Sequence, residues 1–200
     1  MKVALTGGIA CGKSLLSQFL NELGVETLDA DDVVHELLPD PEERRRIAAE
    51  VFSDPEKRRA LEAKIHPLVK EKIDTWLSLS PSGSGAQPQF SNSDPSAPLR
   101  LCAGKKGIKI AIIPLLFEAH WEKNFDIICC VVSSREKQIE RMTTTRGMTC
   151  AEAEARLAAQ LPVEEKAKRS HYVIHNDGTA EELRVEAQKL IDWLSTTNPA

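Results

Sequence analysis

The hydrophobic positions of this chain follow two spacings, one typical of buried strands and one typical of amphipathic helices. Between short apolar runs, apolar residues recur every three or four positions, as in Leu16, Leu20 and Leu23. The runs themselves lie at residues 3–5, 25–28, 108–116, 125–132 and 172–174. Runs without alternating polar positions are typical of strands that are covered on both faces. The pattern therefore predicts an α/β three-layer sandwich, a parallel sheet between two layers of helices.

Two stretches between the second and third predicted strands depart from this alternation. Residues 39–76 have helical spacing and many charges, most of which we expect on a solvated face. Within them, His66-Pro67 predicts a kink or a helix break, because the residue before a proline disfavours helical geometry. Residues 78–107 are rich in Ser, Pro and Gly and show no periodicity. That composition predicts a flexible surface insertion; a domain linker is the alternative.

The segment from Gly7 to Ser14, which we call the phosphate loop, joins the first predicted strand to the first predicted helix. It matches G-x-x-x-x-G-K-[ST], in which Gly7, Gly8 and Gly12 let backbone N–H groups approach phosphate oxygens. Lys13 would reach the β- and γ-phosphates, and the Ser14 hydroxyl would ligate the Mg²⁺ that bridges them. A plain glycine-rich turn is the alternative. The flanking strand and helix favour a site for a nucleoside triphosphate.

Acidic residues follow the second predicted strand at Asp29, Asp31 and Asp32. Carboxylates at the carboxyl end of a strand beside a phosphate loop can accept a proton from an attacking hydroxyl or help to hold Mg²⁺. An aspartate there can also cap the next helix. We expect Asp31 to do the chemistry and a neighbour to cap. Glu118, after the third apolar run, is an alternative acid near the metal.

Arginines lie on two predicted helices and the turn between them, at Arg135, Arg141 and Arg146. Ser134 is a plausible N-cap, and Thr149 begins a capping box for the second helix. Fixed positive charges of this kind suit a lid that closes over a phosphoryl group during transfer. Each arginine taken alone is explained equally well by surface ion pairs, so the lid prediction rests on the group.

The turn at residues 175–178 precedes the terminal helix, which we expect at residues 181–194. It lies at the carboxyl end of the last predicted strand, where its backbone and the Asn176 amide could hold a nucleotide base. An ordinary turn explains the same residues equally well.

Composition narrows the function. The formal net charge of −4 and the isoelectric point near 5.8 argue against nucleic-acid binding. No apolar run approaches the length of a membrane span, and the expected location is cytoplasmic. The five cysteines show no zinc-site spacing, so free thiols are expected. The Cys11 thiol lies in the phosphate loop, where positive charge could activate it; a plain small loop residue is the favoured interpretation.

An ordered set of motifs resembles the dephospho-CoA kinase family over most of the chain outside residues 78–107. The motifs are residues 4–9, Gly12-Lys13-Ser14, Asp29-Ala30-Asp31, His66-Pro67, residues 114–118, Gln160, Glu165-Lys166, Asn176 and Gly178. The resemblance implies a P-loop, nucleotide-kinase-like core with a helical substrate-binding part and a lid. It also implies transfer of the γ-phosphate of ATP to the 3′-hydroxyl of dephospho-CoA, with Mg²⁺.

Carried over to this chain, the family's general base corresponds to Asp31, and its phosphate-contacting lid arginine corresponds to Arg141. The substrate side corresponds to His66 and Pro67, to which we add Leu115. The ATP-binding segment corresponds to Ala10, Cys11, Gly12, Lys13, Ser14 and Leu15, with Asn176 and Gly178 on the base side.

The expected organisation is a single domain. Its core comprises residues 1–32 and 108–200, with a lid at about 135–165, and residues 33–77 form the substrate-binding part. The expected partners are ATP and dephospho-CoA alone, without nucleic acid or membrane, and the expected state is a monomer or a weak homo-oligomer. Two alternatives stay open: another small-molecule kinase of the same fold, and a non-catalytic regulator that binds ATP.

Overall fold

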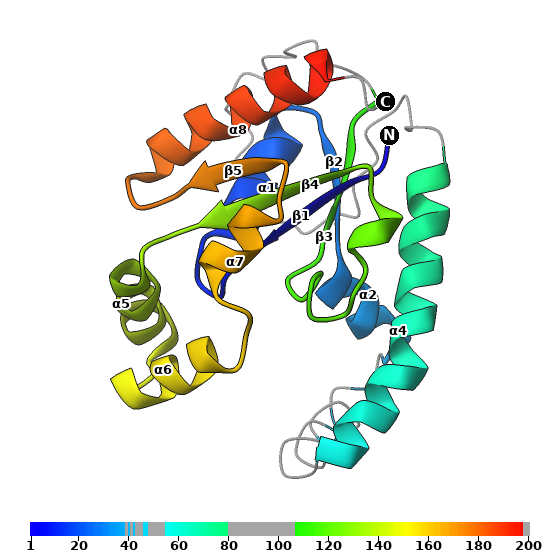
Figure 1. Ribbon diagram of the computed structural model, residues 1–200, viewed down its shortest axis with the longest axis vertical. Helices are drawn as coiled ribbons and strands as arrows, with labels where there is room; N and C mark the ends of the chain where they lie inside the picture. The colour runs from blue at the N-terminus through cyan, green and yellow to red at the C-terminus, as the bar shows by residue number, and fades with distance from the viewer. Residues whose placement is uncertain (39, 41, 43–45, 48–54, 80–106, 198–200) are drawn as a thin grey trace, which may run out of the picture.

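A computed structural model describes residues 1–38, 40, 42, 46–47, 55–79 and 107–197 (Figure 1). Its five strands form one parallel sheet in the order β2-β3-β1-β4-β5. The strands are β1 (Val3–Gly7), β2 (Glu26–Asp29), β3 (Lys109–Ile112), β4 (Ile127–Val132) and β5 (Tyr172–His175). The chain order of the strands reverses direction across the sheet at β1. In open α/β sheets, ligands bind beyond the carboxyl ends of the strands at that reversal.

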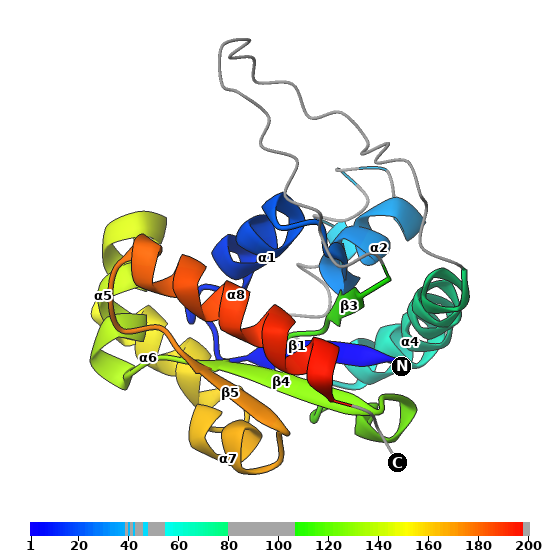
Figure 2. The ribbon, with the colours of Figure 1, turned by 90° about the horizontal axis from the view of Figure 1, so that it is seen from above.

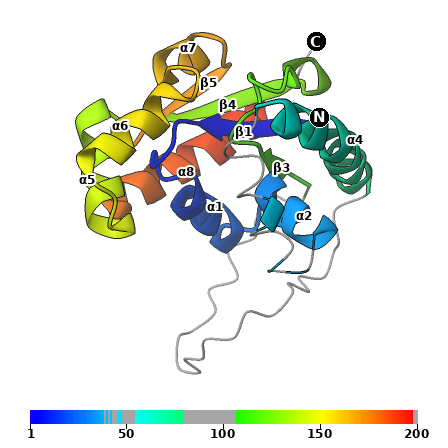
Figure 3. The same cartoon turned by 90° about the horizontal axis from the view of Figure 1, so that it is seen from below.

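The described helices alternate with the strands, which confirms the predicted α/β class. They are α1 (Lys13–Glu22), α2 (Ala30–Leu37), α4 (Pro55–Ser78), α5 (Arg135–Arg146), α6 (Cys150–Ala158), α7 (Val163–Lys168) and α8 (Ala180–Thr196), with a short 3₁₀ turn η1 (Glu122–Asn124). Figures 2 and 3 show α1 and α8 on one face of the sheet and α7 on the other. In Figure 1, α5 and α6 lie beyond the carboxyl ends of β1 and β4. No helix in the described part of the chain is long and apolar enough to cross a membrane.

Both faces of the central strands are buried, as the unbroken apolar runs predict. In β1, Val3 and Leu5 pack into the cluster formed with α1 and α8, whereas Ala4 packs into the cluster formed with α2 and α4. Strand β3 divides in the same way, because successive side chains of a strand point to opposite faces. The sheet is thus packed between two apolar layers. This packing fixes the positions of the loops that begin at the carboxyl ends of the strands.

Strand β3 is shorter than the apolar run that predicts it. The run extends to Leu116, but the strand ends at Ile112 and the chain then turns from Pro114 onwards. Proline has no N–H with which to continue the ladder, so the strand ends close to it. Leu116 and Phe117 are still fully buried, because the turn folds back onto the cluster beside α4. Ile113, Leu116 and Phe117 therefore belong to a buried segment that follows the strand and are not part of it.

Helix α4 continues through Pro67, so of the two outcomes expected at this proline, a kink or a break, the break is wrong. Val69 and Ile73, on the far side of the proline, are buried against the sheet. That packing holds the helix together where a proline alone would destabilise it by about 3 kcal/mol. The expected insertion at residues 78–107 lies almost wholly outside the described residues.

Candidate active site

The phosphate loop connects β1 to α1 at the centre of the sheet. Gly12 has a φ of 91°, a left-handed conformation, and α1 begins at the next residue, Lys13. A Cβ on Gly12 would collide with the Asn176 side-chain amide, so both conformation and space require glycine there. Ser14 lies exposed in the first turn of α1, and Leu15 packs against the core below it. The loop and the helix N-terminus therefore have the strand–loop–helix arrangement that an anion site requires.

The Lys13 ammonium folds back across the loop. Its Nζ lies 3.1 Å from the Gly7 carbonyl oxygen and 2.8 Å from that of Gly8. Burial lowers the pKa of this ammonium from its ordinary value. The hydrogen bonds described for this half-buried cation go to neutral carbonyls, so it would gain from an anionic partner such as a phosphate group.

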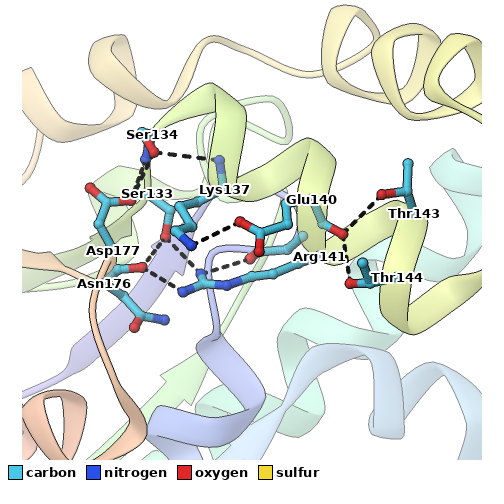
Figure 4. Close-up of polar contacts among 10 residues, drawn as sticks. Ser133, Ser134, Lys137, Glu140, Arg141, Thr143, Thr144, Asn176 and Asp177 are labelled. Atoms are coloured by element: carbon cyan, nitrogen blue, oxygen red, sulfur yellow. Dashed lines mark hydrogen bonds and ion pairs between the residues drawn. The ribbon is translucent and has the colours of Figure 1, made fainter.

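Arg141 lies against the same loop from α5. Its guanidinium donates to the carbonyl oxygen of Ala10 at 3.2 Å, to Ser133 Oγ at 2.9 Å and to the carbonyl oxygen of Asn176 at 2.8 Å. Ser133 Oγ donates in turn to the Asn176 carbonyl at 2.7 Å, so the three residues form one network (Figure 4). The expected arginine is thus at the phosphate loop, with its planar fork oriented by fixed acceptors.

Asn176 is nearly fully buried and faces the loop from the end of β5. Its Nδ2 donates to the carbonyl oxygen of Cys11 at 2.9 Å. The amide that we expect to hold the base therefore also supports the phosphate loop. Gly178 lies in the following turn beside Glu182, which belongs to the capping box at the start of α8.

A further loop contact, from Gln138, is absent from the candidate residues obtained from the sequence. Its Nε2 donates to the carbonyl oxygen of Ile9 at 2.7 Å and lies 3.1 Å from Cys11 Sγ. Gln138 stands three residues before Arg141 on α5, so both side chains share one helix face. This spacing could have identified Gln138 from the sequence, because a polar residue one turn before Arg141 lies on the helix face that is expected to meet the phosphates.

The three aspartates after β2 divide their tasks. Asp29 is the N-cap of α2, with its Oδ1 accepting from the Asp31 N–H at 2.9 Å. Burial raises the pKa of the Asp29 carboxyl, and the charges of Asp31 and Asp32 act in the same direction. The Lys13 charge opposes this increase in the pKa of Asp29. Asp31 and Asp32 are exposed in the first turn, so Asp31 is not used as the cap.

Glu118 forms an ion pair rather than standing open to solvent. Its Oε1 lies 2.8 Å from Lys166 Nζ and accepts from the Leu161 N–H at 3.1 Å. Lys166 is fully buried on α7 and also donates to the Pro114 carbonyl at 2.9 Å. The pair therefore ties α7 and the chain after α6 to the turn that follows β3.

Replacing Lys166 with methionine should destabilise the fold by about 3 kcal/mol, because a partly buried carboxylate then loses its charged partner. For a chain of this size that corresponds to a Tm lower by roughly 6 to 12 °C, measured by calorimetry. The matched control is Lys168→Met, which removes an exposed lysine from the same helix and should change Tm little. A Tm equal to that of the parent in Lys166→Met would show that the pair does not stabilise the fold.

The three residues expected on the substrate side lie on two other segments. His66 and Pro67 are on α4, where the His66 ring contacts the Trp121 ring edge-on, with centroids 5.4 Å apart. Leu115, in the turn after β3, keeps 45% of its surface exposed although its neighbour Leu116 is buried. An exposed leucine at the carboxyl edge of the sheet is available to an apolar part of a ligand.

A cavity of about 310 Å³ lies between the phosphate loop and the segment expected to be the lid. Its lining includes Gly8 and Ile9 from the loop, Gln138 from α5, and residues 157–158 and 160–164. Arg135 and Glu154, which also line it, form an ion pair of 3.2 Å between α5 and α6. Ser134 caps α5 and Thr149 forms a capping box with Glu152 at α6, as the sequence predicts. The two helices thus stand as an ordered pair facing the loop.

Cys11 is a buried small residue of the loop, as favoured from the sequence. Burial raises the pKa of its thiol from the ordinary value, so the alternative of an activated thiol is wrong. Cys129 and Cys130 are buried in β4, where burial raises the pKa of each thiol to about 12, and Cys150 is exposed. These four described cysteines are free thiols, as expected.

The fold and the loop fit Mg²⁺ held largely by a triphosphate. Among the described residues, no three His, Cys, Asp or Glu side chains gather in a ready-made metal site. Mg²⁺ keeps several waters and takes one or two protein oxygens together with substrate phosphates. The exposed Ser14 hydroxyl, and carboxylates at the start of α2, are oxygen donors of that kind.

A phosphate loop at the strand-order reversal of a parallel sheet, contacted by Arg141 from α5, is the arrangement expected of a P-loop kinase. Among solved structures, TT1252 from Thermus thermophilus is 28% identical with a TM-score of 0.71, covering 99% of this chain and 98% of its own. A dephospho-CoA kinase from Campylobacter jejuni shares the fold, with a TM-score of 0.64, 24% identity and coverage of 98% of each chain.

Sequence comparison defines the family more closely. The family model described as dephospho-CoA kinase matches residues 1–43 and 101–182. A dephospho-CoA kinase from Synechococcus sp. (strain JA-3-3Ab) is 34% identical over 212 residues, covering 94% of this chain and 90% of the relative. The chain belongs to the dephospho-CoA kinase family, which confirms the resemblance seen in the ordered motifs.

Proposed function

We propose that this kinase transfers the γ-phosphate of ATP to the 3′-hydroxyl of dephospho-CoA, with Asp31 as the proton acceptor. The observation that carries the proposal is the position of Asp31. It lies exposed in the first turn of α2, directly after the carboxyl end of β2, and the phosphate loop follows the carboxyl end of β1 in the same parallel sheet. An acceptor hydroxyl beside Asp31 is therefore at the same edge of the sheet as the loop assigned to the donor phosphates.

The loop residues bind and orient the triphosphate. Backbone N–H groups of residues 8–14 and the positive end of α1 attract the phosphates, and Lys13 provides a charge next to the transferred group. The Ser14 hydroxyl is the ligand that we assign to Mg²⁺, which when bound would supply positive charge against the triphosphate. Most of the acceleration then comes from orientation and fixed charge.

Asp31 and Arg141 act on opposite sides of the reacting phosphoryl group in this proposal. Asp31 accepts the proton from the ribose hydroxyl, which is a poor nucleophile while protonated. Arg141 stabilises the charge that develops on the transferred group, and α6 helps to exclude water when the lid closes. His66, Pro67 and Leu115 are assigned to the dephospho-CoA side.

Replacing Arg141 with alanine should lower kcat more than it weakens ATP binding, because its charge is needed most in the transition state. We expect a fall of about 10²-fold in kcat. Single-turnover kinetics and calorimetric ATP binding give the two quantities. Arg141→Lys keeps the charge without the planar fork and should retain more activity. Equal losses of ATP binding and kcat in Arg141→Ala would argue against a transition-state role.

The direct test of the proposed reaction is analysis of its product. Incubation with ATP, Mg²⁺ and dephospho-CoA should give a product heavier by one phosphoryl group, with a new phosphomonoester at the 3′-oxygen in the ³¹P spectrum. A phosphate at another oxygen, or no product although ATP is bound, would contradict the proposal. A cytoplasmic location and a monomeric or weakly self-associating state remain predictions alongside it.

A further inference from the structure

Five consecutive carbonyl oxygens of the phosphate loop accept hydrogen bonds from side chains. Lys13 holds those of Gly7 and Gly8, and Arg141 holds that of Ala10. Gln138 holds the carbonyl of Ile9, between these two, and Asn176 holds that of Cys11. The loop is therefore fixed from the side of its carbonyl groups by donors from three separate parts of the chain.

The direction of each carbonyl determines the direction of a neighbouring N–H. No described peptide bond is cis, and in a trans peptide the carbonyl and the following N–H point in opposite directions. A donor that holds the Ile9 carbonyl thus also orients the N–H of Ala10. Anion binding by such a loop requires several N–H groups to converge.

The backbone conformation of Ala10 explains why the loop needs these hydrogen bonds. Its φ of 58° lies in the left-handed region, which is disfavoured for any residue with a Cβ. Such conformations persist where the surroundings over-determine them. The peptide on the N-terminal side of Ala10 is held by Gln138, and the peptide on its C-terminal side is held by Arg141.

Gln138 and Asn176 are the members of this set that carry no charge, and both are almost completely buried, with 3% and 5% of their surfaces exposed; of the two, Gln138 holds the peptide next to Ala10. A Cβ on Gly8 would press against its Nε2, so the side chain and the loop backbone are in close contact. Because it is neutral, removing its amide changes loop geometry without removing a charge from the phosphates. Its role can therefore be separated from those of Lys13 and Arg141.

We infer that Gln138 is a positioning residue that holds the Ile9–Ala10 peptide of the phosphate loop in its phosphate-binding orientation. The inference deepens the proposed function and rests on it, because the loop is taken to bind the triphosphate of ATP. Gln138 acts through the backbone N–H groups and does not itself touch the reacting atoms. It also fixes α5, which carries Arg141, against the loop.

The test compares Gln138→Met, which fills a similar volume without a donor, with Glu140→Gln on the exposed face of the same helix. Calorimetry in the presence of Mg²⁺ gives the Kd of ATP, and competition gives the Kd of inorganic tripolyphosphate.

Loss of one buried hydrogen bond should weaken the binding of both ligands about tenfold in Gln138→Met. Glu140→Gln should match the parent. Tripolyphosphate contacts only phosphate-binding groups, so an equal loss for both ligands locates the defect at the loop.

Unchanged ATP affinity in folded Gln138→Met would overturn the inference, as would a loss for ATP without a loss for tripolyphosphate. If the methionine variant does not fold, Gln138→Leu, which is also uncharged and has no donor, is judged by the same two affinities; if neither folds, Gln138 is a structural residue and the inference is wrong. The readout needs no acceptor. A parent protein that binds ATP but does not phosphorylate dephospho-CoA would thus refute the proposed function alone, and one that binds no ATP would refute both.

Discussion

Replacing Asp31 with asparagine is expected to lower kcat by about 10²- to 10⁴-fold while leaving ATP binding nearly unchanged. Asparagine keeps the size of the side chain but cannot accept the proton of the ribose hydroxyl. Because Asp29, not Asp31, caps α2 through its side chain, the substitution should not unfold the helix. Steady-state kinetics with dephospho-CoA and calorimetric ATP binding measure the two effects.

The matched control is Asp32→Asn. Asp32 is the next residue in the same exposed turn, so its substitution changes the net charge of the turn by the same amount. We expect it to retain most of the parent's turnover. Comparable losses of turnover in the two variants would show that turnover depends on the negative charge of the turn as a whole. They would contradict a specific role of Asp31 as proton acceptor.

Replacing Lys13 with alanine should lower kcat by about 10²- to 10³-fold, the effect typical of removing one fixed donor to a developing negative charge. The ammonium is held at Gly7 and Gly8, next to the position expected for the transferred phosphate. ATP binding should weaken as well, since the lysine also contacts phosphates in the ground state. Rapid-quench kinetics at saturating ATP separates the two effects.

A lysine on α5 provides the comparison for Lys13. Lys137 pairs with Glu140 on an exposed face and makes no described contact with the loop, so Lys137→Ala should behave as the parent does. Near-normal turnover in Lys13→Ala would contradict the assignment of the loop as the site of phosphoryl transfer.

The loop, strands and helix starts that surround the site could be predicted from the sequence, because each depends on residues close together in the chain. The glycine spacing gives the loop, unbroken apolar runs give the buried strands, and Ser134 and Thr149 give the starts of α5 and α6. Each of these features depends on residues within a few positions of one another. Their agreement with the structure reflects strong short-range preferences.

Side-chain partners far apart in the sequence were not predictable in this way. Glu118 could be placed near the site, but its pairing with Lys166 depends on how α7 packs on the sheet. Asn176 has the polar character of a turn residue, and only the fold brings its amide to the Cys11 carbonyl. At Pro67 the local rule predicts a kink or a break, and buried contacts of Val69 and Ile73 keep the helix continuous. In these cases tertiary packing decided the outcome.

The most direct test of the central claim is a coupled assay of ADP release with ATP and Mg²⁺, comparing dephospho-CoA with adenosine as acceptor. The proposed function predicts release that requires dephospho-CoA, continues in Asp32→Asn and falls at least a hundredfold in Asp31→Asn. Release that is equally fast with adenosine would indicate another small-molecule kinase. Bound ATP without release in any variant would contradict catalysis and favour a regulator that binds ATP.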